Sequence, residues 1–170
     1  SDTRSSQVWR TDADGATASQ VTDLAIDVEA FVLSPDAKKL AVGLSTRPGC
    51  TTPRCTVEAR EAAAREAGKA TGVAHDRVFV RHWDAWADGE RNHLYVLQLN
   101  ENGRATGHTA VTAGLDADVP TKPFGDDADF AFTRDGSALI FSAKIAGKSE
   151  PWSTNYDLWR TPADGSAAPV

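Results

Sequence analysis

One phrase occurs at both ends of the chain, and it constrains the fold more than any other feature. Residues 7–15 read QVWRTDADG and residues 157–165 read DLWRTPADG, so Trp-Arg-Thr precedes Ala-Asp-Gly at the same spacing in both. A short run with an aromatic residue that leads into Asp-Gly predicts a strand entering a tight turn. Because this unit recurs, we expect an architecture built from repeated supersecondary units.

A second pair of segments aligns in the same way. FVLSPDAKKLAVGLS (residues 31–45) matches FAFTRDGSALIFSAK (residues 130–144) in its alternation of apolar and other residues. The turn-forming residues also fall at matching places, positions 34–37 and 133–136. Two alternating runs around a turn predict a β-hairpin in each segment.

A third copy of the terminal phrase lies in the middle of the chain. HLYVLQLNENG (residues 93–103) repeats the strand with a slightly longer turn. We call the hairpins of residues 31–45 and 130–144 inner hairpins, and the strand-and-turn phrases parts of outer hairpins. The two kinds alternate along the chain, and an inner hairpin followed by an outer hairpin makes one four-stranded blade of a β-propeller. The sequence therefore predicts an all-β chain in which residues 1–170 are part of one propeller domain of four-stranded antiparallel blades.

Each predicted blade carries extra residues between its second and third strands. The first insertion covers residues 46–92 and the second, shorter one covers residues 145–155. Loops at one topological position in successive blades emerge on the same face of a propeller. We therefore expect both insertions to decorate one surface.

The first insertion should contain a surface helix and an extra hairpin. Thr52 and Pro53 provide a capping hydroxyl and a proline at the first helical position, and Gly68 is a natural stop. Val57 is almost the only larger apolar residue of the helix, which indicates a surface position. After it, residues 77–86 (RVFVRHWDAW) alternate as a strand, and residues 87–90 (ADGE) should turn that strand back.

The two cysteines, Cys50 and Cys55, are five positions apart. Two thiols this close, with no others to choose from, favour a small local disulfide. Two alternatives remain open at this point. The thiols could be unpaired, or they could bind a metal together with His75 and His82, although that spacing matches no zinc pattern.

Composition excludes several classes of function. The chain has 170 residues, 41% of them hydrophobic, which is enough for a packed core in one domain or in part of a larger one. Its net charge of −6 is spread along the sequence, so neither nucleic acid nor a membrane surface is an expected partner. The sequence has no Met and retains no secretory signal, so we expect a processed, trimmed or excised chain.

No catalytic or cofactor motif is present. The sequence lacks the Gly-x-Ser-x-Gly elbow, the His-Glu-x-x-His helix, the phosphate-binding loop and the dinucleotide fingerprint, and we expect no cofactor. Asp126, Asp127 and Asp129 could suggest calcium, but the Gly and Glu of an EF-hand loop are missing. A solvated entrance to a strand is the favoured interpretation.

The first candidate binding run is RHWDAW, which contains Arg81, His82, Trp83, Asp84 and Trp86. Aromatic side chains beside charges often mark binding surfaces. The stronger alternative is structural: the two tryptophans pack the extra hairpin on its blade, and Arg81 pairs with Asp84.

The second candidate run is EPWSTNYD, residues 150–157, in the second insertion. Glu150 and Trp152 are its candidate site residues. The structural alternative is an ordered loop with a buried Trp152. Both candidate runs should face the same surface.

With these repeats in place, the chain resembles the propeller of prolyl-oligopeptidase-type serine peptidases. Two phrases, HDRVFVRHWDAWADGERNHLYV and PFGDDADFAFTRDGSALIFSAKIAGKSEPWSTNYDLW, resemble bacterial dipeptidyl aminopeptidases and acylaminoacyl peptidases. The likeness runs from about Gln7 to the end of the chain. The region around Cys50 and Cys55 also resembles the inserted segment of this family, which is typical of exported enzymes.

The resemblance implies a periplasmic or secreted serine peptidase whose propeller caps an α/β-hydrolase domain. The propeller would gate access of short peptides and dock on the catalytic domain, which supplies the Ser-Asp-His triad. None of that domain is in this chain. The pair of adjacent glutamates that anchors substrates in dipeptidyl peptidases has no match either, since Glu58 and Glu61 are not adjacent.

Two rival functions follow from the same repeats: a stand-alone TolB-like binding module, and a structural segment that assembles with other copies. In every case the chain alone should hydrolyse nothing. Its partial propeller should also leave strand edges near Val8 and Leu158, and the strands of Trp9 and Trp159 should need a neighbouring blade.

Overall fold

Four antiparallel strands form the first sheet, in the order β3-β4-β7-β8. Their bounds are Ala30–Leu33 (β3), Lys39–Thr46 (β4), Arg91–Leu99 (β7) and Ala105–Ala110 (β8). This structure is a computed structural model, and it describes residues 5–68, 72, 74–75, 78, 81–82 and 85–170.

The second sheet has three strands in the order β11-β10-β9. They are β9 (Phe130–Phe132), β10 (Ala138–Ala143) and β11 (Asp157–Pro162). A separate hairpin, β1 (Trp9–Thr11) with β2 (Ala18–Gln20), precedes both sheets.

The two hairpins predicted from the aligned segments are confirmed. In the first sheet Phe31 lies opposite Val42, and in the second Phe130 lies opposite Phe141, which is the pairing that the alignment requires. Both turns close with the same hydrogen bond, from Ser34 N to Lys39 O at 2.9 Å and from Thr133 N to Ala138 O at 2.8 Å. The third copy of the terminal phrase likewise forms a hairpin, β7 with β8.

The main core lies between the two sheets. The face of the first sheet that carries Ala41, Leu94 and Val96 packs against the face of the second that carries Leu139 and Phe141. We call these the trailing face of the first sheet and the leading face of the second. Residues two apart on a strand share a face, so these sets follow from the alternation in the sequence.

Trp159 also belongs to the leading face of the second sheet. Its side chain packs against the core between the sheets, where the first sheet already covers it. On this side, the first sheet is therefore the neighbour that the Trp159 strand is predicted to need.

A second core covers the leading face of the first sheet. Val42 and Tyr95 pack there against Val8, Val21 and Ile26, which come from the segment around the β1-β2 hairpin. The backbone of Val8 is paired within the chain, since its carbonyl accepts from Val21 N at 2.9 Å and its N–H donates to Thr22 Oγ1 at 2.9 Å. The backbone of Val8, which we expected at an unpaired strand edge, is thus paired with residues 21–22 of the same chain.

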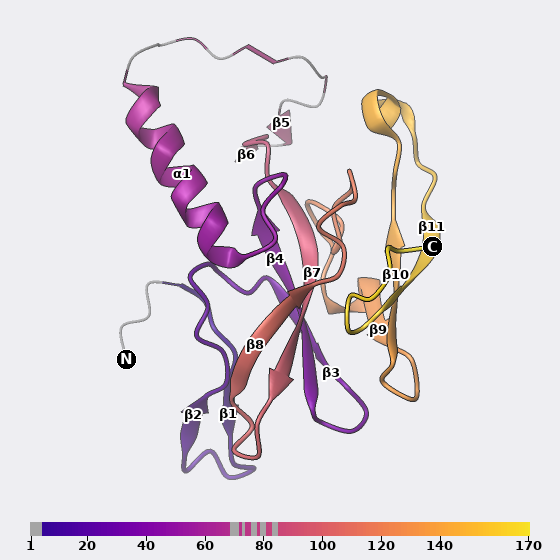
Figure 1. Ribbon diagram of the computed structural model, residues 1–170. Helices are drawn as coiled ribbons and strands as arrows, with labels where there is room; N and C mark the ends of the chain where they lie inside the picture. The colour runs from indigo at the N-terminus through magenta and orange to yellow at the C-terminus, as the bar shows by residue number, and fades with distance from the viewer. Residues whose placement is uncertain (1–4, 69–71, 73, 76–77, 79–80, 83–84) are drawn as a thin grey trace.

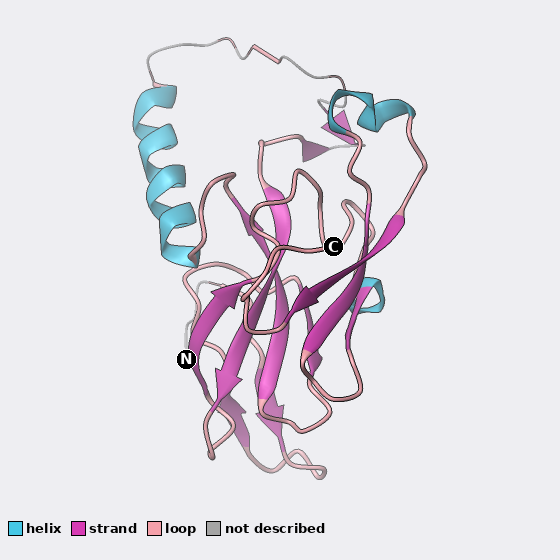
Figure 2. Cartoon of the chain, turned by 45° about the vertical axis from the view of Figure 1, so that its right-hand side comes forward, coloured by secondary structure: helices cyan, strands magenta, loops and turns pink. Residues whose placement is uncertain are grey.

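Both insertions lie at the same end of the sheets, as Figures 1 and 2 show. The first contains α1 (Pro53–Ala67) and a two-strand hairpin, β5 (Arg81–His82) with β6 (Ala85–Trp86). The second contains the 3₁₀ helix η2 (Gly147–Trp152). A second 3₁₀ turn, η1 (Asp127–Asp129), leads into β9.

The helix begins and ends where the sequence predicts. Thr52 Oγ1 accepts from Cys55 N at 3.2 Å, Pro53 occupies the first turn, and Gly68 is the C-cap residue. The disulfide between Cys50 and Cys55 is also confirmed, with their Cα atoms 5.5 Å apart. Neither cysteine is therefore an unpaired thiol or a metal ligand.

The extra hairpin is paired differently from the prediction. β5 pairs with β6 so that Arg81 lies opposite Trp86 and His82 opposite Ala85. Arg81–His82 and Ala85–Trp86 are thus opposite strands and not parts of one strand, and residues 87–90 connect β6 to β7. The Arg81 guanidinium lies over the Trp86 ring at 5.6 Å from its centroid, a cation–π contact that favours this register.

The described part of the chain is mostly β, with antiparallel sheets and one α-helix, which agrees with the predicted all-β class. These sheets do not close into a ring. None of the described helices has the length and apolar character needed to cross a bilayer.

Candidate functional site

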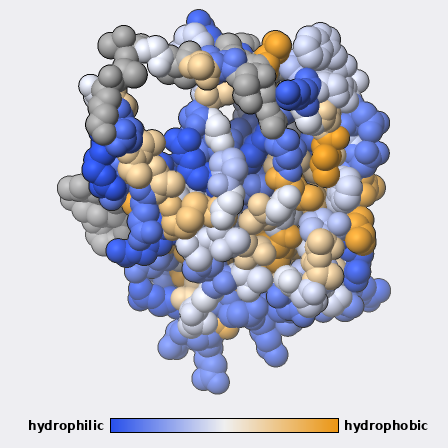
Figure 3. Space-filling model, turned by 45° about the horizontal axis from the view of Figure 1, so that its top comes forward, coloured by the Kyte–Doolittle hydropathy of each residue, from blue (hydrophilic) through white to orange (hydrophobic). Residues whose placement is uncertain are grey.

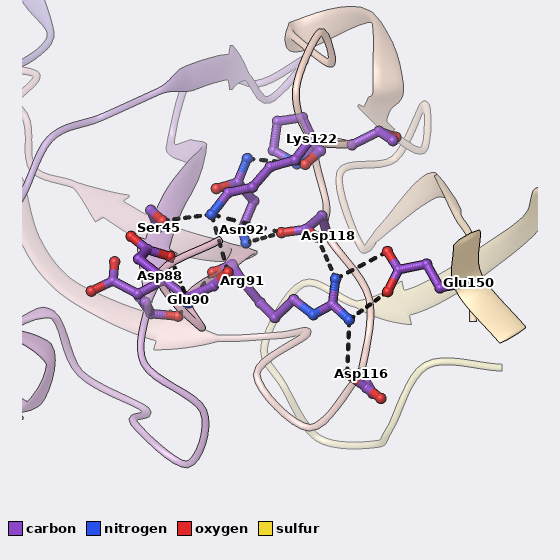
Figure 4. Close-up of polar contacts among 12 residues, drawn as sticks. Ser45, Asp88, Glu90, Arg91, Asn92, Asp116, Asp118, Lys122 and Glu150 are labelled. Carbon is purple, nitrogen blue, oxygen red and sulfur yellow. Dashed lines mark hydrogen bonds and ion pairs between the residues drawn. The ribbon is translucent and has the colours of Figure 1, made fainter. Parts of the chain in front are cut away.

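The densest cluster of charges lies where the two insertions meet, and its centre is Arg91, the first residue of β7 (Figure 4). The guanidinium donates to Asp118 Oδ2 at 2.7 Å and to Asp116 Oδ1 at 3.1 Å. It also reaches the carboxylate of Glu150 in η2 with two hydrogen bonds, of 2.9 and 3.2 Å. One side chain therefore ties the first sheet, the loop after β8 and the second insertion together.

Backbone pairing positions the carboxylate of Asp118. Asp118 Oδ1 accepts from Asn92 N at 2.8 Å, and the next residue, Val119, donates its N–H to Asn92 O at 2.8 Å. The Asn92 amide nitrogen donates to Pro120 O at 3.1 Å. The segment after β8 thus runs along the start of β7 like a further short strand, which brings Asp118 beside Arg91.

A buried glutamate anchors the helix next to this cluster. Glu90 accepts from Arg60 of α1 with two hydrogen bonds, of 2.6 and 2.8 Å, and Arg47 Nε lies 3.3 Å from the same carboxylate. The hydrogen bond to Glu90 raises the pKa of Arg60. Two cations thus neutralise one buried anion, which is the condition for burying a carboxylate at moderate cost.

The environment shifts three ionisable groups of the cluster. Burial alone would lower the pKa of Arg91, but the hydrogen bonds to Glu150 and Asp118 outweigh it and raise that pKa. Burial raises the pKa of Tyr156, with the neighbouring carboxylates adding to the effect. Burial lowers the pKa of His93, two residues along β7 from Arg91, to about 4, so this imidazole is neutral at pH 7.

A small hollow opens between the charges. Its volume is about 20 Å³, which is enough for about one water molecule and too little for a peptide. The residues that line it come from both sides of the cluster: Asp118, Thr121, Lys122, Lys144, Glu150 and Tyr156. Its ammonium groups already have partners, since Lys122 Nζ donates to Ser45 Oγ at 3.0 Å and Lys144 Nζ to Glu150 O at 3.3 Å.

The described residues hold one contact that resembles a nucleophile beside a base. Thr112 Oγ1 lies 3.5 Å from His93 Nδ1, but both side chains are buried. No substrate can reach a pair that is buried in this way, and the lowered pKa of His93 makes its imidazole a weak base. This pair is part of the core.

The structure divides the first candidate run. Arg81 and Trp86 form the cation–π pair of the β5-β6 hairpin, and Trp86 is 64% exposed. The backbone of His82 pairs in β5 with Ala85. Trp83 and Asp84 lie outside the described residues, so the proposed pairing of Arg81 with Asp84 stays a prediction.

The two candidate residues of the second run have different environments. Glu150 is engaged by Arg91, whereas Trp152 is 73% exposed, so the alternative of a loop with a buried Trp152 is wrong. Both residues belong to η2, on either side of Pro151; the Glu150 carboxylate contacts Arg91 of β7, and the Trp152 side chain is exposed to solvent.

Two of the three aspartates before β9 accept hydrogen bonds from backbone N–H groups. Asp126 caps η1 by accepting from Ala128 N at 2.8 Å, and Asp129 Oδ2 accepts from Thr121 N at 2.9 Å. In the described part of the chain, no group of three or more His, Cys, Asp or Glu side chains is arranged to hold a metal ion.

Sequence reasoning missed Arg91, Asp116 and Asp118 as site residues. Each stands in a stretch that contains no motif, and they meet because two loops converge on one strand end. The sequence offered one indirect indication of these residues. Two insertions predicted to lie on one surface should contact each other or the sheet between them, and charged residues near their ends are candidates for that contact.

Comparison with known proteins adds a distant relationship. No family model matches the chain. It is similar to dipeptidyl-peptidase 5 of Schizosaccharomyces pombe, 33% identical over 78 residues, which are 41% of this chain and 11% of that protein. The protein of the same name from Trichophyton schoenleinii is 30% identical over 111 residues, or 62% of this chain and 15% of that protein.

The longest of these three similarities covers 146 residues of dipeptidyl-peptidase 5 from Arthroderma otae, at 26% identity over 81% of this chain and 19% of that protein. The chain thus spans less than a fifth of the length of these relatives. At this level of identity and coverage, the comparisons support a relationship to proteins that are peptidases, and so to hydrolases.

Proposed function

We propose that this chain is part of the β-propeller of a secreted serine peptidase of the dipeptidyl-peptidase type, and that it gates short peptide substrates and docks on the catalytic domain. The observation that carries the proposal is the stacking of two antiparallel sheets, one of four strands and one of three, whose strands follow one another in chain order and whose long connections lie at one end. A chain with this construction is also related to dipeptidyl-peptidase 5 over most of its length.

The register supports a propeller in particular. Phe31 and Phe130 occupy equivalent places in their hairpins, and so do Val42 and Phe141. The trailing face of the first sheet packs on the leading face of the second, which is how successive blades pack. An arrangement related by repetition extends in the same direction with each further sheet.

A gating role fits the chemistry of the insertion-bearing end. The charges there form ion pairs with one another, and the hollow among them holds about one water molecule. Such a surface can shape an entrance without performing a reaction. The disulfide between Cys50 and Cys55 supports an oxidising compartment, in keeping with secretion.

The test is to express the complete reading frame that encodes these residues beside the 170-residue protein. Both are assayed on chromogenic dipeptidyl and N-acyl-aminoacyl substrates. We expect turnover by the complete product, lost when the Ser of a Gly-x-Ser-x-Gly elbow is replaced by Ala, and none by the 170 residues alone. A complete product without that elbow or turnover would favour the TolB-like binding module.

Gating can be tested separately in the complete product, by comparing its activity on long and short peptides. Replacing Arg91 by Met should loosen the contact between the insertions, so kcat/KM should rise for peptides of ten or more residues relative to dipeptidyl substrates. Arg54→Met, which removes an exposed pair with Glu58 on the helix surface, is the matched control. Equal changes for long and short substrates would argue against a gate.

A further inference from the structure

Large aromatic side chains are exposed around the insertion-bearing end of the molecule. Trp86 of β6 is 64% exposed and Trp152 of η2 is 73% exposed. Phe124 is 71% exposed, and it stands two residues after Lys122, whose Nζ donates to Glu90 O at 3.1 Å. The three come from separate segments of the chain, so no single loop accounts for them. Aromatic residues are enriched where protein surfaces contact one another.

The opposite end of the sheets has a different composition. It consists of the turns of the hairpins β1-β2, β3-β4, β7-β8 and β9-β10, as Figure 1 shows. Their sequences are DADGAT (12–17), SPDAK (34–38), NENGR (100–104) and RDGS (134–137), and none of them contains an aromatic residue. The two ends of the described sheets therefore differ in their capacity to form an interface, and the insertion-bearing end is the one suited to it.

The exposure of these side chains does not depend on how many sheets the protein has. The two sheets pack face to face, and a further sheet of the same kind would pack against a face as well. Trp86 and Trp152 lie beyond the ends of the strands, in the connections between β4 and β7 and between β10 and β11. A partner that covers them must approach from the direction of the strand ends.

Both tryptophans are held on ordered supports. The Arg81 guanidinium lies over the Trp86 ring, 5.6 Å from its centroid, which orients that ring. The turn that carries Trp152 is tied to β7 by the hydrogen bonds between Glu150 and Arg91. A side chain whose position is already fixed loses little conformational entropy when a partner covers it, so these residues are favourable contacts.

The surface between them suits a broad partner better than a small ligand. Its hollow of about 20 Å³ holds about one water molecule. The central charge, Arg91, is neutralised by Asp118 and Glu150, so it does not select a charged ligand. Figure 3 shows this end with hydrophobic residues beside hydrophilic ones, and with strong hydrophobic colouring toward the second sheet. Apolar side chains spread among paired charges are the composition of an interface between domains.

We infer that the insertion-bearing end is the surface on which the catalytic domain docks, with Trp86 and Trp152 as its main contacts. The inference rests on the proposed function, which gives the complete protein a catalytic domain but assigns no surface to it. The matched regions are only 11% to 19% of the dipeptidyl-peptidase 5 proteins compared above, so most of each relative lies outside them.

The size of the exposed residues fits an interface of this kind. An interface between two domains of one chain buries about 600–1,500 Å² in total. One large aromatic side chain can bury about 150–250 Å². Trp86, Phe124 and Trp152 together would therefore supply a substantial part of the surface that such a contact needs.

The test is thiol labelling of the complete product of the reading frame under native conditions. Cys50 and Cys55 are joined, so this chain contributes no thiol of its own, and the unsubstituted product gives the background. Trp86→Cys and Trp152→Cys place a thiol on the insertion-bearing end. Asn102→Cys, in the exposed turn between β7 and β8, is the matched control at the opposite end. We expect the two tryptophan positions to be labelled about tenfold more slowly than position 102, since the domains must separate first.

A pair of lysine substitutions gives a second measurement that needs no labelling. Trp152→Lys should place an unpaired charge in the docked interface, so the complete product should lose its hydrolytic activity at a lower temperature than the parent protein. Asn102→Lys adds the same charge to the exposed turn and should match the parent. This pair decides the matter if a cysteine variant proves inactive, and therefore misfolded.

The outcomes separate the inference from the function on which it rests. An active product in which Trp86→Cys and Trp152→Cys are labelled as fast as Asn102→Cys would overturn the inference and leave the proposed function standing. Slow labelling of Asn102→Cys alone would also overturn it, because the catalytic domain would then cover the opposite end. A complete product without a hydrolase domain would remove both.

Discussion

Arg91, at the start of β7, and Glu150, in the second insertion, form a two-pronged ion pair across a separation of 59 positions in the sequence. The guanidinium and the carboxylate present two donors and two acceptors in matching planes, so the contact fixes orientation as well as distance. The 3₁₀ turn of the second insertion is thereby held against the start of β7.

Replacing Arg91 by Met should loosen this turn before it unfolds the sheets. Asp118 and Glu150 would lose their guanidinium partner, and because Arg91 is largely buried the cost should be about 2 kcal/mol, between the values for exposed and buried pairs. Hydrogen exchange should rise in residues 147–153 and change little in β4.

Arg91→Lys separates charge from geometry, because an ammonium cannot form the two-pronged contact. Compared with Arg91→Met, Arg91→Lys should recover part of the lost free energy of unfolding but little of the protection from hydrogen exchange in residues 147–153. Uniform exchange across the chain in Arg91→Met would instead indicate that the ion pair holds the whole fold and not the turn.

His93 should make the protein sensitive to acid. The folded chain holds the pKa of His93 at about 4, and the ordinary value is 6.5. Between these pH values the unfolded state binds a proton that the folded state does not, so stability falls as the pH falls from about 7 to 4. The loss should approach about 3 kcal/mol, at about 1.4 kcal/mol for each unit of pKa.

Urea unfolding at several pH values measures this slope. His93→Gln should flatten it between pH 4 and 7, whatever its effect at pH 7, while His108→Gln, an exposed histidine on β8, should keep the slope of the parent. Parallel curves for His93→Gln and the parent protein would show that another group causes the acid sensitivity.

The two equivalent hairpin turns end on different residues at the same left-handed position and give a matched pair of substitutions. Ala37 has φ of 56°, and its counterpart Gly136 has φ of 67°. A side chain in this left-handed region costs about 1 kcal/mol, so Ala37→Gly should stabilise and Gly136→Ala should destabilise by about that amount. A Cβ at Gly136 would meet nothing closer than Pro35 Cδ at 3.8 Å, so the cost is one of backbone conformation.

Thermal or urea unfolding of both variants shows whether each substitution raises or lowers the free energy of unfolding. If Ala37→Gly destabilises, the entropy that glycine adds to the unfolded chain outweighs the relief of strain at this turn.

Reduction of the Cys50–Cys55 disulfide should weaken the start of α1. The closed loop is short, and loop-closure entropy for about six residues amounts to about 2 kcal/mol. The Cys50→Ser and Cys55→Ser double variant should lose this stability and become insensitive to reductant. Intact mass after alkylation without reductant gives a direct check, and two modified thiols in freshly purified oxidised protein would contradict the disulfide.

The sequence by itself determined the local structure. The alternation in residues 31–45 and 130–144 specified both hairpins and their registers, because a slip of one residue would turn Val42 or Phe141 away from its core. Thr52, Pro53 and Gly68 specified the bounds of the helix through capping, which depends on residues adjacent in sequence. The spacing of the cysteines likewise favoured their pairing.

Only the tertiary structure decided which side chains meet. β5 pairs with β6 before the ADGE segment, and the Arg81 guanidinium then lies over the Trp86 ring, a contact that the turn signal in the sequence does not indicate. Nothing near Arg91 in the sequence indicates Glu150 or Asp118, since their meeting depends on how two loops fold back over one strand end. Leu94 and Leu158 stand at the same place in their alternating strands, but Leu94 is buried and Leu158 is exposed. The strand alone determines which face of the sheet a residue lies on, whereas its burial depends on whether another sheet packs against that face.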